Sequence, residues 1–113
     1  MAVPLTQLLH LKPAAATPAA IYTVPVGRRA RIRLFAVDVG GAGDVALAWL
    51  IANGEVRDDD INAFAYGIAV GANQRVPVTD EFMYISEEDS VEVSSTGGNT
   101  VFTLNTYEDD LPA

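Results

Sequence analysis

Residues that could carry catalysis or hold a metal are few in this chain of 113 residues, and they lie far apart. His10 is the single histidine and there is no cysteine, so a metal ion or a proton transfer would find no second partner of either type. None of the four serines stands in a Gly-x-Ser-x-Gly sequence, and no phosphate-binding glycine loop occurs. We therefore expect no enzymatic activity, no catalytic residue, no cofactor and no metal site, and we interpret His10 as a structural or exposed histidine.

The acidic stretch DDDIN, residues 58 to 62, has part of the spacing of a calcium-binding loop. Asp58, Asp60 and Asn62 stand at the first, third and fifth positions of an EF-hand pattern. The pattern then fails, because Ala63 stands where the sixth position needs glycine and Ala69 stands where the twelfth needs glutamate. The sequence favours a solvated turn here, with Asp60 as the cap of a short helical turn.

A second acidic cluster, SEEDS at residues 86 to 90, lies between two apolar runs. Paired carboxylates can act as acid and base, but only in a pocket that raises one of the two pKa values. The position between two apolar runs is typical of a hairpin tip, so we interpret the cluster as a soluble turn that joins strands.

The most concentrated charge is the basic stretch VPVGRRARIRLF, residues 25 to 36, with four arginines within six positions. Nucleic acid is disfavoured as its partner, because the formal net charge is -8 and the stripe has no interleaved aromatic residue except Phe35 beyond its end. An ordinary exposed strand face and a docking face for an acidic protein are the two other interpretations. Side chains alternate between the faces of a strand, so three arginines are expected opposite three apolar residues: Arg29, Arg31 and Arg33 against Ala30, Ile32 and Leu34.

Charge is unevenly distributed along the chain. The first 33 residues contain five basic residues and no acidic one, whereas the rest contains two arginines and all fifteen acidic residues. A separation of this kind favours ordered self-association or docking on an acidic surface.

Short segments rich in Val, Ile, Thr, Tyr and Phe alternate with turn sequences such as PVG and TGGN, which is the all-β pattern. We predict a single antiparallel β-sandwich or jelly-roll-like domain of about eight short strands. The expected strands lie near residues 5 to 11, 20 to 25, 29 to 39, 44 to 52, 64 to 70, 74 to 79, 82 to 85 together with 90 to 95, and 100 to 107.

We expect an extended N-terminal arm that includes the first strand, residues 1 to 19, followed by the sandwich domain, residues 20 to 113, with a short acidic C-terminal tail. The stretch LKPAAATPAAIY is typical of an arm or linker, because proline lacks an N–H donor and disfavours helix at the residue before it. The longest apolar run, residues 45 to 52, is far too short to span a bilayer, so no membrane partner is expected.

The expected strand at residues 44 to 52 is apolar on both faces. Such a strand is either central in its sheet or covered on its second side by the arm or by another subunit.

Aromatic residues could form a platform on which a sugar stacks. They are scattered about one per strand, however, and core packing produces the same distribution. We therefore favour core positions for the six residues in question: Tyr22, Trp49, Tyr66, Tyr84, Phe102 and Tyr107.

The stretch AIYTVPVGRRARIRLFAVDV, followed by a glycine-rich turn and an apolar strand, resembles the opening of small virion proteins of tailed bacteriophages. Residues 58 to 109 are similar to the second half of the same family, where an apolar strand leads through a turn into a strand such as Val91 to Ser95 and a closing strand. Two departures are Glu88, which stands where the family's turn has glycine, and Val26, which stands where alanine is commoner.

This resemblance implies a capsid decoration or cement protein, made in the host cytoplasm and placed on the exterior of the virion. Its expected partners are the major capsid protein and other copies of itself, as a homotrimer, and neither nucleic acid nor membrane. A tail or baseplate component is the alternative structural role, and a carbohydrate-binding adhesion module that exposes Trp49 and the tyrosines is the alternative of another class. The expected partner-binding residues lie in the arm and the arginine stripe: Leu8, Leu9, Lys12, Arg28, Arg29, Arg31 and Arg33.

Overall fold

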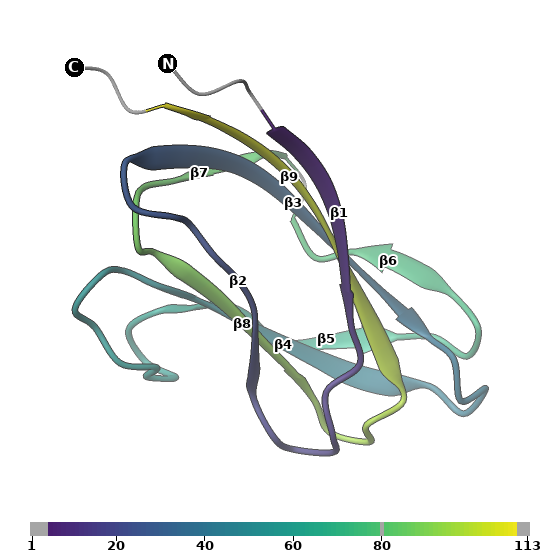
Figure 1. The fold of residues 1–113 in the computed structure, drawn as a ribbon. Helices are drawn as coiled ribbons and strands as arrows, with labels where there is room; N and C mark the ends of the chain where they lie inside the picture. The colour runs from purple at the N-terminus through teal and green to yellow at the C-terminus, as the bar shows by residue number, and fades with distance from the viewer. Residues whose placement is uncertain (1–4, 80, 111–113) are drawn as a thin grey trace.

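The computed structural model describes residues 5–79 and 81–110, which form two antiparallel sheets packed face to face (Figure 1). The chain is therefore the predicted β-sandwich, with nine strands among the described residues. Sheet A contains β1 (Leu5–Leu11), β9 (Thr100–Asp110), β3 (Arg28–Asp38), β6 (Arg75–Pro77) and β7 (Met83–Ile85). Sheet B contains β2 (Ala19–Thr23), β8 (Ser90–Ser95), β4 (Asp44–Ile51) and β5 (Ala63–Val70).

The two longest strands, β3 and β9, form the centre of sheet A. They pair without interruption from Arg28 opposite Asp110 to Asp38 opposite Thr100. On the other side of β9 lies the edge strand β1, while β6 and β7 pair with different parts of β3. Sheet B has the order β2, β8, β4, β5.

The turn before β3 sets the phase of that strand. Gly27 has a φ of 81°, which glycine adopts without steric cost, and the Arg28 N–H donates to the Pro25 carbonyl at 3.2 Å. From this turn β3 continues with its even-numbered residues inside, where Ile32 and Leu34 are completely buried. The predicted alternation along β3 is thus confirmed.

The core lies between the inner faces of the two sheets. Its largest fully buried apolar side chains come from the central strands of sheet A: Phe102 and Leu104 of β9, and Ile32 and Leu34 of β3. Four fully buried valines complete it: Val24, Val70, Val91 and Val93. From β4 the buried residues of this cluster are the small Ala46 and Ala48, and Leu50 packs against it, whereas Trp49 lies outside it.

Residues 12 to 18 carry the chain from sheet A to sheet B. Pro13 is buried, and the Ala16 N–H donates to the Ser95 carbonyl at 2.8 Å. Residues 5 to 19, which were expected to form part of an N-terminal arm with the first strand, form the edge strand β1 and a connection between the sheets. Residues 1 to 4 lie outside the described part of the chain.

The expected strand that joined residues 82 to 85 with 90 to 95 is two strands in different sheets. β7 pairs with β3 in sheet A, whereas β8 lies between β2 and β4 in sheet B. The acidic turn between them is closed by Asp89, whose Oδ2 accepts from the Ser86 N–H at 2.9 Å. This turn therefore crosses from one sheet to the other and is not the tip of a hairpin.

Within the described residues there is no α-helix, and hence no helix long and apolar enough to cross a membrane. The expected helical turn at residues 58 to 62 is a hydrogen-bonded turn. Its cap is Asp58 in place of Asp60: the Asp58 carboxylate accepts from the Asp60 N–H at 2.8 Å, and the Asp58 carbonyl accepts from the Asn62 N–H at 3.1 Å.

Candidate functional site

The arginine stripe lies on the outer face of sheet A, along its central strand β3. Arg29 and Arg31 are exposed and Arg33 is half-buried, while the residues between them point into the core. Further side chains share this surface: Phe35 of β3, Arg75 of β6, Phe82 directly before β7, Tyr84 of β7 and Tyr107 of β9. We call it the arginine face and define it by eight residues: Arg29, Arg31, Arg33, Phe35, Arg75, Phe82, Tyr84 and Tyr107.

Aromatic rings alternate with guanidinium groups along the arginine face. The distances from guanidinium carbon to ring centroid are 4.6 Å for Arg31 to Tyr107, 5.4 Å for Arg31 to Phe82, 5.6 Å for Arg33 to Phe82, 5.2 Å for Arg33 to Phe35 and 4.0 Å for Arg75 to Phe35. All are within the reach of cation–π attraction, which is about 6 Å. The expectation that the stripe lacks interleaved aromatic residues is therefore wrong, because neighbouring strands supply the rings.

Arg29 is neutralised by the chain's own acidic C-terminal strand. Its Nε lies 2.8 Å from Oδ1 of Asp109, the residue directly opposite on β9. The hydrogen bond to Asp109, and next its charge, raise the pKa of Arg29, and the same hydrogen bond lowers the pKa of Asp109. One end of the stripe thus already has a carboxylate partner.

Arg28 does not belong to the arginine face. Its Nε lies 2.9 Å from the buried Glu108 carboxylate, and its Nη1 lies 3.1 Å from Asp110. Glu108 also accepts a hydrogen bond from the Tyr22 hydroxyl on β2, so the cluster connects sheet A with sheet B. Burial, and next the hydrogen bond to Glu108, raise the pKa of Tyr22. Arg28, which was expected to contact a partner, thus makes ion pairs within its own chain.

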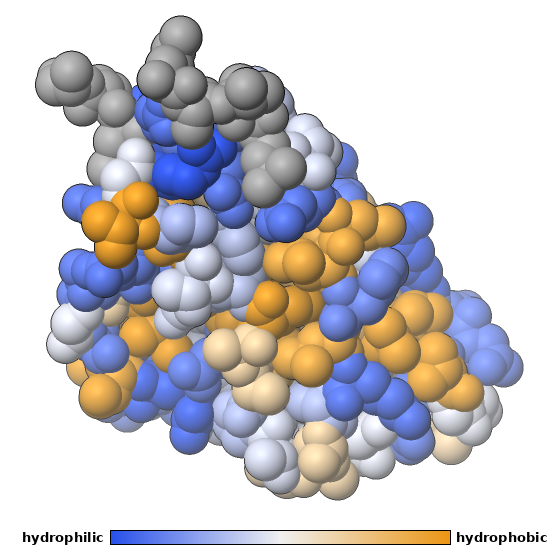
Figure 2. Space-filling view, viewed as in Figure 1, coloured by the Kyte–Doolittle hydropathy of each residue, from blue (hydrophilic) through white to orange (hydrophobic). Residues whose placement is uncertain are grey.

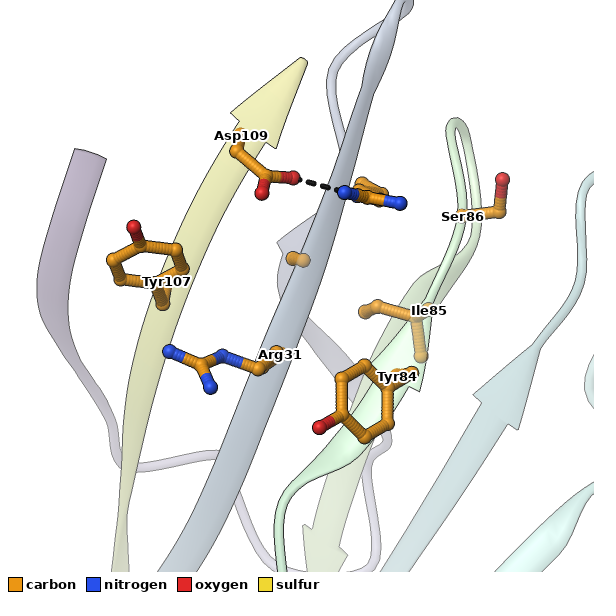
Figure 3. Close-up of a pocket in the computed structure, with 8 residues that line it drawn as sticks. Arg31, Tyr84, Ile85, Ser86, Tyr107 and Asp109 are labelled. Atoms are coloured by element: carbon orange, nitrogen blue, oxygen red, sulfur yellow. Dashed lines mark hydrogen bonds and ion pairs between the residues drawn. The ribbon is translucent and has the colours of Figure 1, made fainter. Parts of the chain in front are cut away.

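A groove of about 620 Å³ opens on the arginine face between β9, β3 and β7 (Figure 3). In the strand register, Arg31 stands directly opposite both Tyr107 on β9 and Tyr84 on β7. The Arg31 side chain leans toward Tyr107, while the Tyr84 side chain on the other side is 75% exposed. Asp109 and Ser86 line the same groove. It therefore combines two aromatic rings, a guanidinium, a carboxylate and a hydroxyl.

The three predicted partner-binding residues of the arm occupy different positions. Leu9 packs against the core, whereas Leu8 on the outer face of β1 is 57% exposed and Lys12 is exposed at the start of the connection. Apolar residues on the surface seen in Figure 2 gather in patches that polar and charged residues separate. Leu8 and Lys12 thus remain accessible, and Leu9 is largely used by the fold.

Trp49 is buried on the outer face of sheet B, outside the core between the sheets. The loop of residues 52 to 62 covers it: its Nε1–H donates to Asp59 at 3.0 Å, and the Arg57 guanidinium lies 5.5 Å from its ring. The second apolar face of β4 is thus covered by a loop of the same chain, and an exposed tryptophan platform for sugars is not formed. In contrast to Trp49, two tyrosines for which core positions were expected are strongly exposed: Tyr66 and Tyr84.

The other residues considered for catalysis or metal binding make hydrogen bonds within the chain. His10 Nδ1 lies 3.0 Å from the Thr103 hydroxyl, and Asp59 accepts from both Trp49 and Tyr66. Among the residues that the structure describes, no group of three or more histidine, aspartate and glutamate side chains is placed to hold a metal ion.

The fold and the arginine face define a β-sandwich protein with one charged and aromatic sheet face. No protein-family model and no curated protein matches the chain. A similar solved structure comes from Bacillus endospore appendages, which form a novel family of disulfide-linked pili; it aligns with a TM-score of 0.60 and 18% identity, over 97% of this chain and 88% of that one. At this identity the similarity shows a shared fold, and the present chain contains no cysteine.

Proposed function

We propose that this protein is a structural subunit that associates with copies of itself and docks on a larger protein assembly, in the form of a decoration or cement protein on the exterior of a bacteriophage capsid. The resemblance of the arginine-rich strand and the second half of the chain to small virion proteins supports the capsid setting, with the major capsid protein as the docking partner. A tail or baseplate position fits the same surfaces. The pilus neighbour supports the general role, because pili are built from repeated subunits.

The observation that carries the proposal is the edge strand β1. It pairs with β9 over seven consecutive residues without a bulge, and it contains no proline and no acidic or basic residue other than His10. On its second side, no described strand satisfies its backbone groups. A long, regular and uncharged edge is a template for pairing with another chain.

The other edges of the sandwich are protected. β2 has a register shift, and β5 has two, one of them at Gly67 with a φ of 86°. β6 and β7 have three residues each, and β6 includes Pro77. Bulges, short length and proline are the devices that block pairing at an edge, so β1 is the preferred site for association.

The test is a change of Leu8 to Lys. A lysine on an edge strand opposes strand pairing, because its charge would be drawn into the joined sheet. We expect the wild-type protein to form a defined oligomer by light scattering after size exclusion, and Leu8→Lys to weaken that association by at least about tenfold. The melting temperature measured at dilution, where both proteins are monomeric, should stay unchanged, since Leu8 is already 57% exposed.

The matched control is Val56→Lys, which also replaces an exposed apolar residue with lysine, with the same change in charge, in a loop away from the edge. It should associate as the wild type does. A wild-type protein that stays monomeric at high concentration, or equal association of the two variants, would contradict the proposal. Electron microscopy of the oligomer then gives the number of copies.

A further inference from the structure

We propose that the groove on the arginine face binds a carboxylated sugar residue of a glycan chain. The site requires neither the edge strand nor self-association, so it is independent of the assembly role. Its basis is a row of three side chains on adjacent strands, Tyr107, Arg31 and Tyr84, which stand directly opposite one another in the register of sheet A.

Arg31 is positioned for a ligand. Its guanidinium lies over the Tyr107 ring at 4.6 Å and near the Phe82 ring at 5.4 Å, so these ring contacts favour one direction of the side chain before any ligand arrives. Among the described carboxylates none forms an ion pair with Arg31, whereas Arg29 on the same face has Asp109. A guanidinium that packs on aromatic rings and is outside the described ion pairs is suited to bidentate recognition of a carboxylate.

Tyr84 supplies the second wall of the groove. Its side chain is 75% exposed and stands across β3 from Tyr107 (Figure 3). An exposed aromatic ring offers an apolar surface with a polar tip, which suits the apolar C–H face of a sugar ring. The groove volume of about 620 Å³ is in the size range of small-ligand sites.

Asp109 and Ser86 determine which class of anion fits. The Asp109 carboxylate, held in place by Arg29, and the Ser86 hydroxyl can accept hydrogen bonds from sugar hydroxyls at the groove's lining. The same carboxylate repels a ligand of dense negative charge. A uronic or sialic acid, with several hydroxyls and one carboxylate, satisfies both conditions.

The net charge of the chain disfavours single-stranded nucleic acid, which is the main alternative ligand for the groove. Rings and arginines on one sheet face also occur in proteins that bind single-stranded nucleic acid. Polyphosphate binding depends on long-range attraction, however, and this chain has a formal net charge of -8. A single carboxylate interacts mainly with its local partner, so the sugar acid is favoured.

In the experiment, the purified full chain is titrated with three probes, and binding is measured by NMR and by calorimetry. The probes are the methyl glycoside of galacturonic acid, which has one carboxylate, the methyl ester of the same glycoside and a thymidine oligonucleotide. We expect the galacturonic acid glycoside to bind in a one-site fashion and the methyl ester, which keeps the ring and loses the charge, to bind at least about tenfold more weakly.

Two variants locate the site, each with a matched control. Tyr84→Ala and Arg31→Gln should each weaken binding by at least about tenfold, whereas Tyr66→Ala, at an exposed tyrosine on sheet B, and Arg75→Gln should bind as the wild type does. Circular dichroism confirms that the variants are folded.

Three results would overturn the proposal. The first is absence of binding to the galacturonic acid glycoside and also to sialyllactose, which tests the second source of the same chemistry. The second is equal binding of the acid and its methyl ester, or binding unaffected by Tyr84→Ala. The third is preferential binding of the oligonucleotide, which would make the groove a nucleic-acid site. None of these results depends on whether Leu8→Lys alters self-association.

Discussion

Glu88 holds a backbone conformation that costs free energy. Its φ is 63°, in the left-handed region that glycine occupies freely. Glu88→Gly should therefore stabilise the protein by about 0.5–1 kcal/mol, with the hydrogen bond from the exposed Asn53 amide as the minor loss. Chemical unfolding at neutral pH measures the difference.

The neighbouring residue Glu87 is the control for this change. It lacks a positive φ, and its carboxylate accepts the Gly27 N–H at 2.7 Å. Glu87→Gly should therefore destabilise the protein. If both glycine variants lower the unfolding free energy, the conformational strain assigned to Glu88 is absent.

Asp44 connects the start of β4 to the turn between β8 and β9. Its carboxylate accepts from the N–H groups of Gly97 at 2.7 Å and Asn99 at 2.9 Å and from the Thr100 hydroxyl at 2.9 Å. Asp44→Ala leaves these donors without their acceptor, and we expect a loss of about 1–3 kcal/mol at neutral pH, measured by urea unfolding.

The pH dependence of this loss identifies the carboxylate as its source. Burial alone would raise the pKa of Asp44, but hydrogen bonds from Gly97, Val45 and Asn99 outweigh burial and hold the pKa well below its usual range. A depressed pKa gives stability that is fully present above about pH 4, the unfolded value, and is lost as the pH falls toward the folded value. The difference between wild type and Asp44→Ala should therefore shrink on acidification; a constant difference would argue against this assignment.

At the scale of elements, the loop of residues 52 to 62 and strand β4 stabilise each other through Trp49. Trp49→Ala removes the side chain that the loop covers, together with the hydrogen bond to Asp59. We expect a loss of about 2–4 kcal/mol, somewhat below the usual cost of a core tryptophan because the loop can move into part of the space. Limited proteolysis should also cut the loop faster.

Val56→Ala is the control in the same loop, since Val56 is 80% exposed. It should change neither stability nor the rate of cleavage. Fast cleavage without a fall in stability in Trp49→Ala would mean that the loop is independent of the sandwich.

A strand or turn could be predicted where it depends on interactions between residues that are close in sequence, and could not where it depends on distant ones. The alternation along β3 and the turn at Gly27 depend on neighbours in sequence, and the structure agrees with both. Sheet membership depends on distant partners: β7 joins β3 while β8 joins β4, although the two form nearly one apolar stretch. The side of β4 that faces the core could not be deduced, because both of its faces are apolar.

The composition of the arginine face also depends on pairing between distant strands, which the sequence does not reveal. The side chains of Phe82 and Tyr84 are two residues apart in an expected strand, so their common face could be inferred. Their position beside Arg31 follows from the pairing of β7 with β3, about fifty residues away in sequence, and from the register of that pairing. Sequence therefore indicated the arginines and missed the rings among them.

At the scale of the whole molecule, the arginine face is a basic region on an acidic protein. Arg31 and Arg33 have no carboxylate partner among the described residues, and the chain has a formal net charge of -8. Copies of the protein therefore repel one another at long range, except where this face meets an acidic surface. The face should orient the copies during association.

The variant Arg31→Glu, Arg33→Glu tests this orientation. It changes the formal net charge from -8 to -12 and replaces local attraction with repulsion, so association should be weak at low salt and should partly recover at high salt, where charges are screened within about 3–10 Å. Sedimentation velocity across a series of salt concentrations measures both effects. The variant Val26→Glu, Val39→Glu, Val56→Glu, Ile61→Glu changes four exposed residues outside the arginine face and has the same formal net charge of -12, so it controls for overall repulsion. If this control and the arginine variant associate equally at every salt concentration, net charge alone governs association and the arginine face has no orienting role.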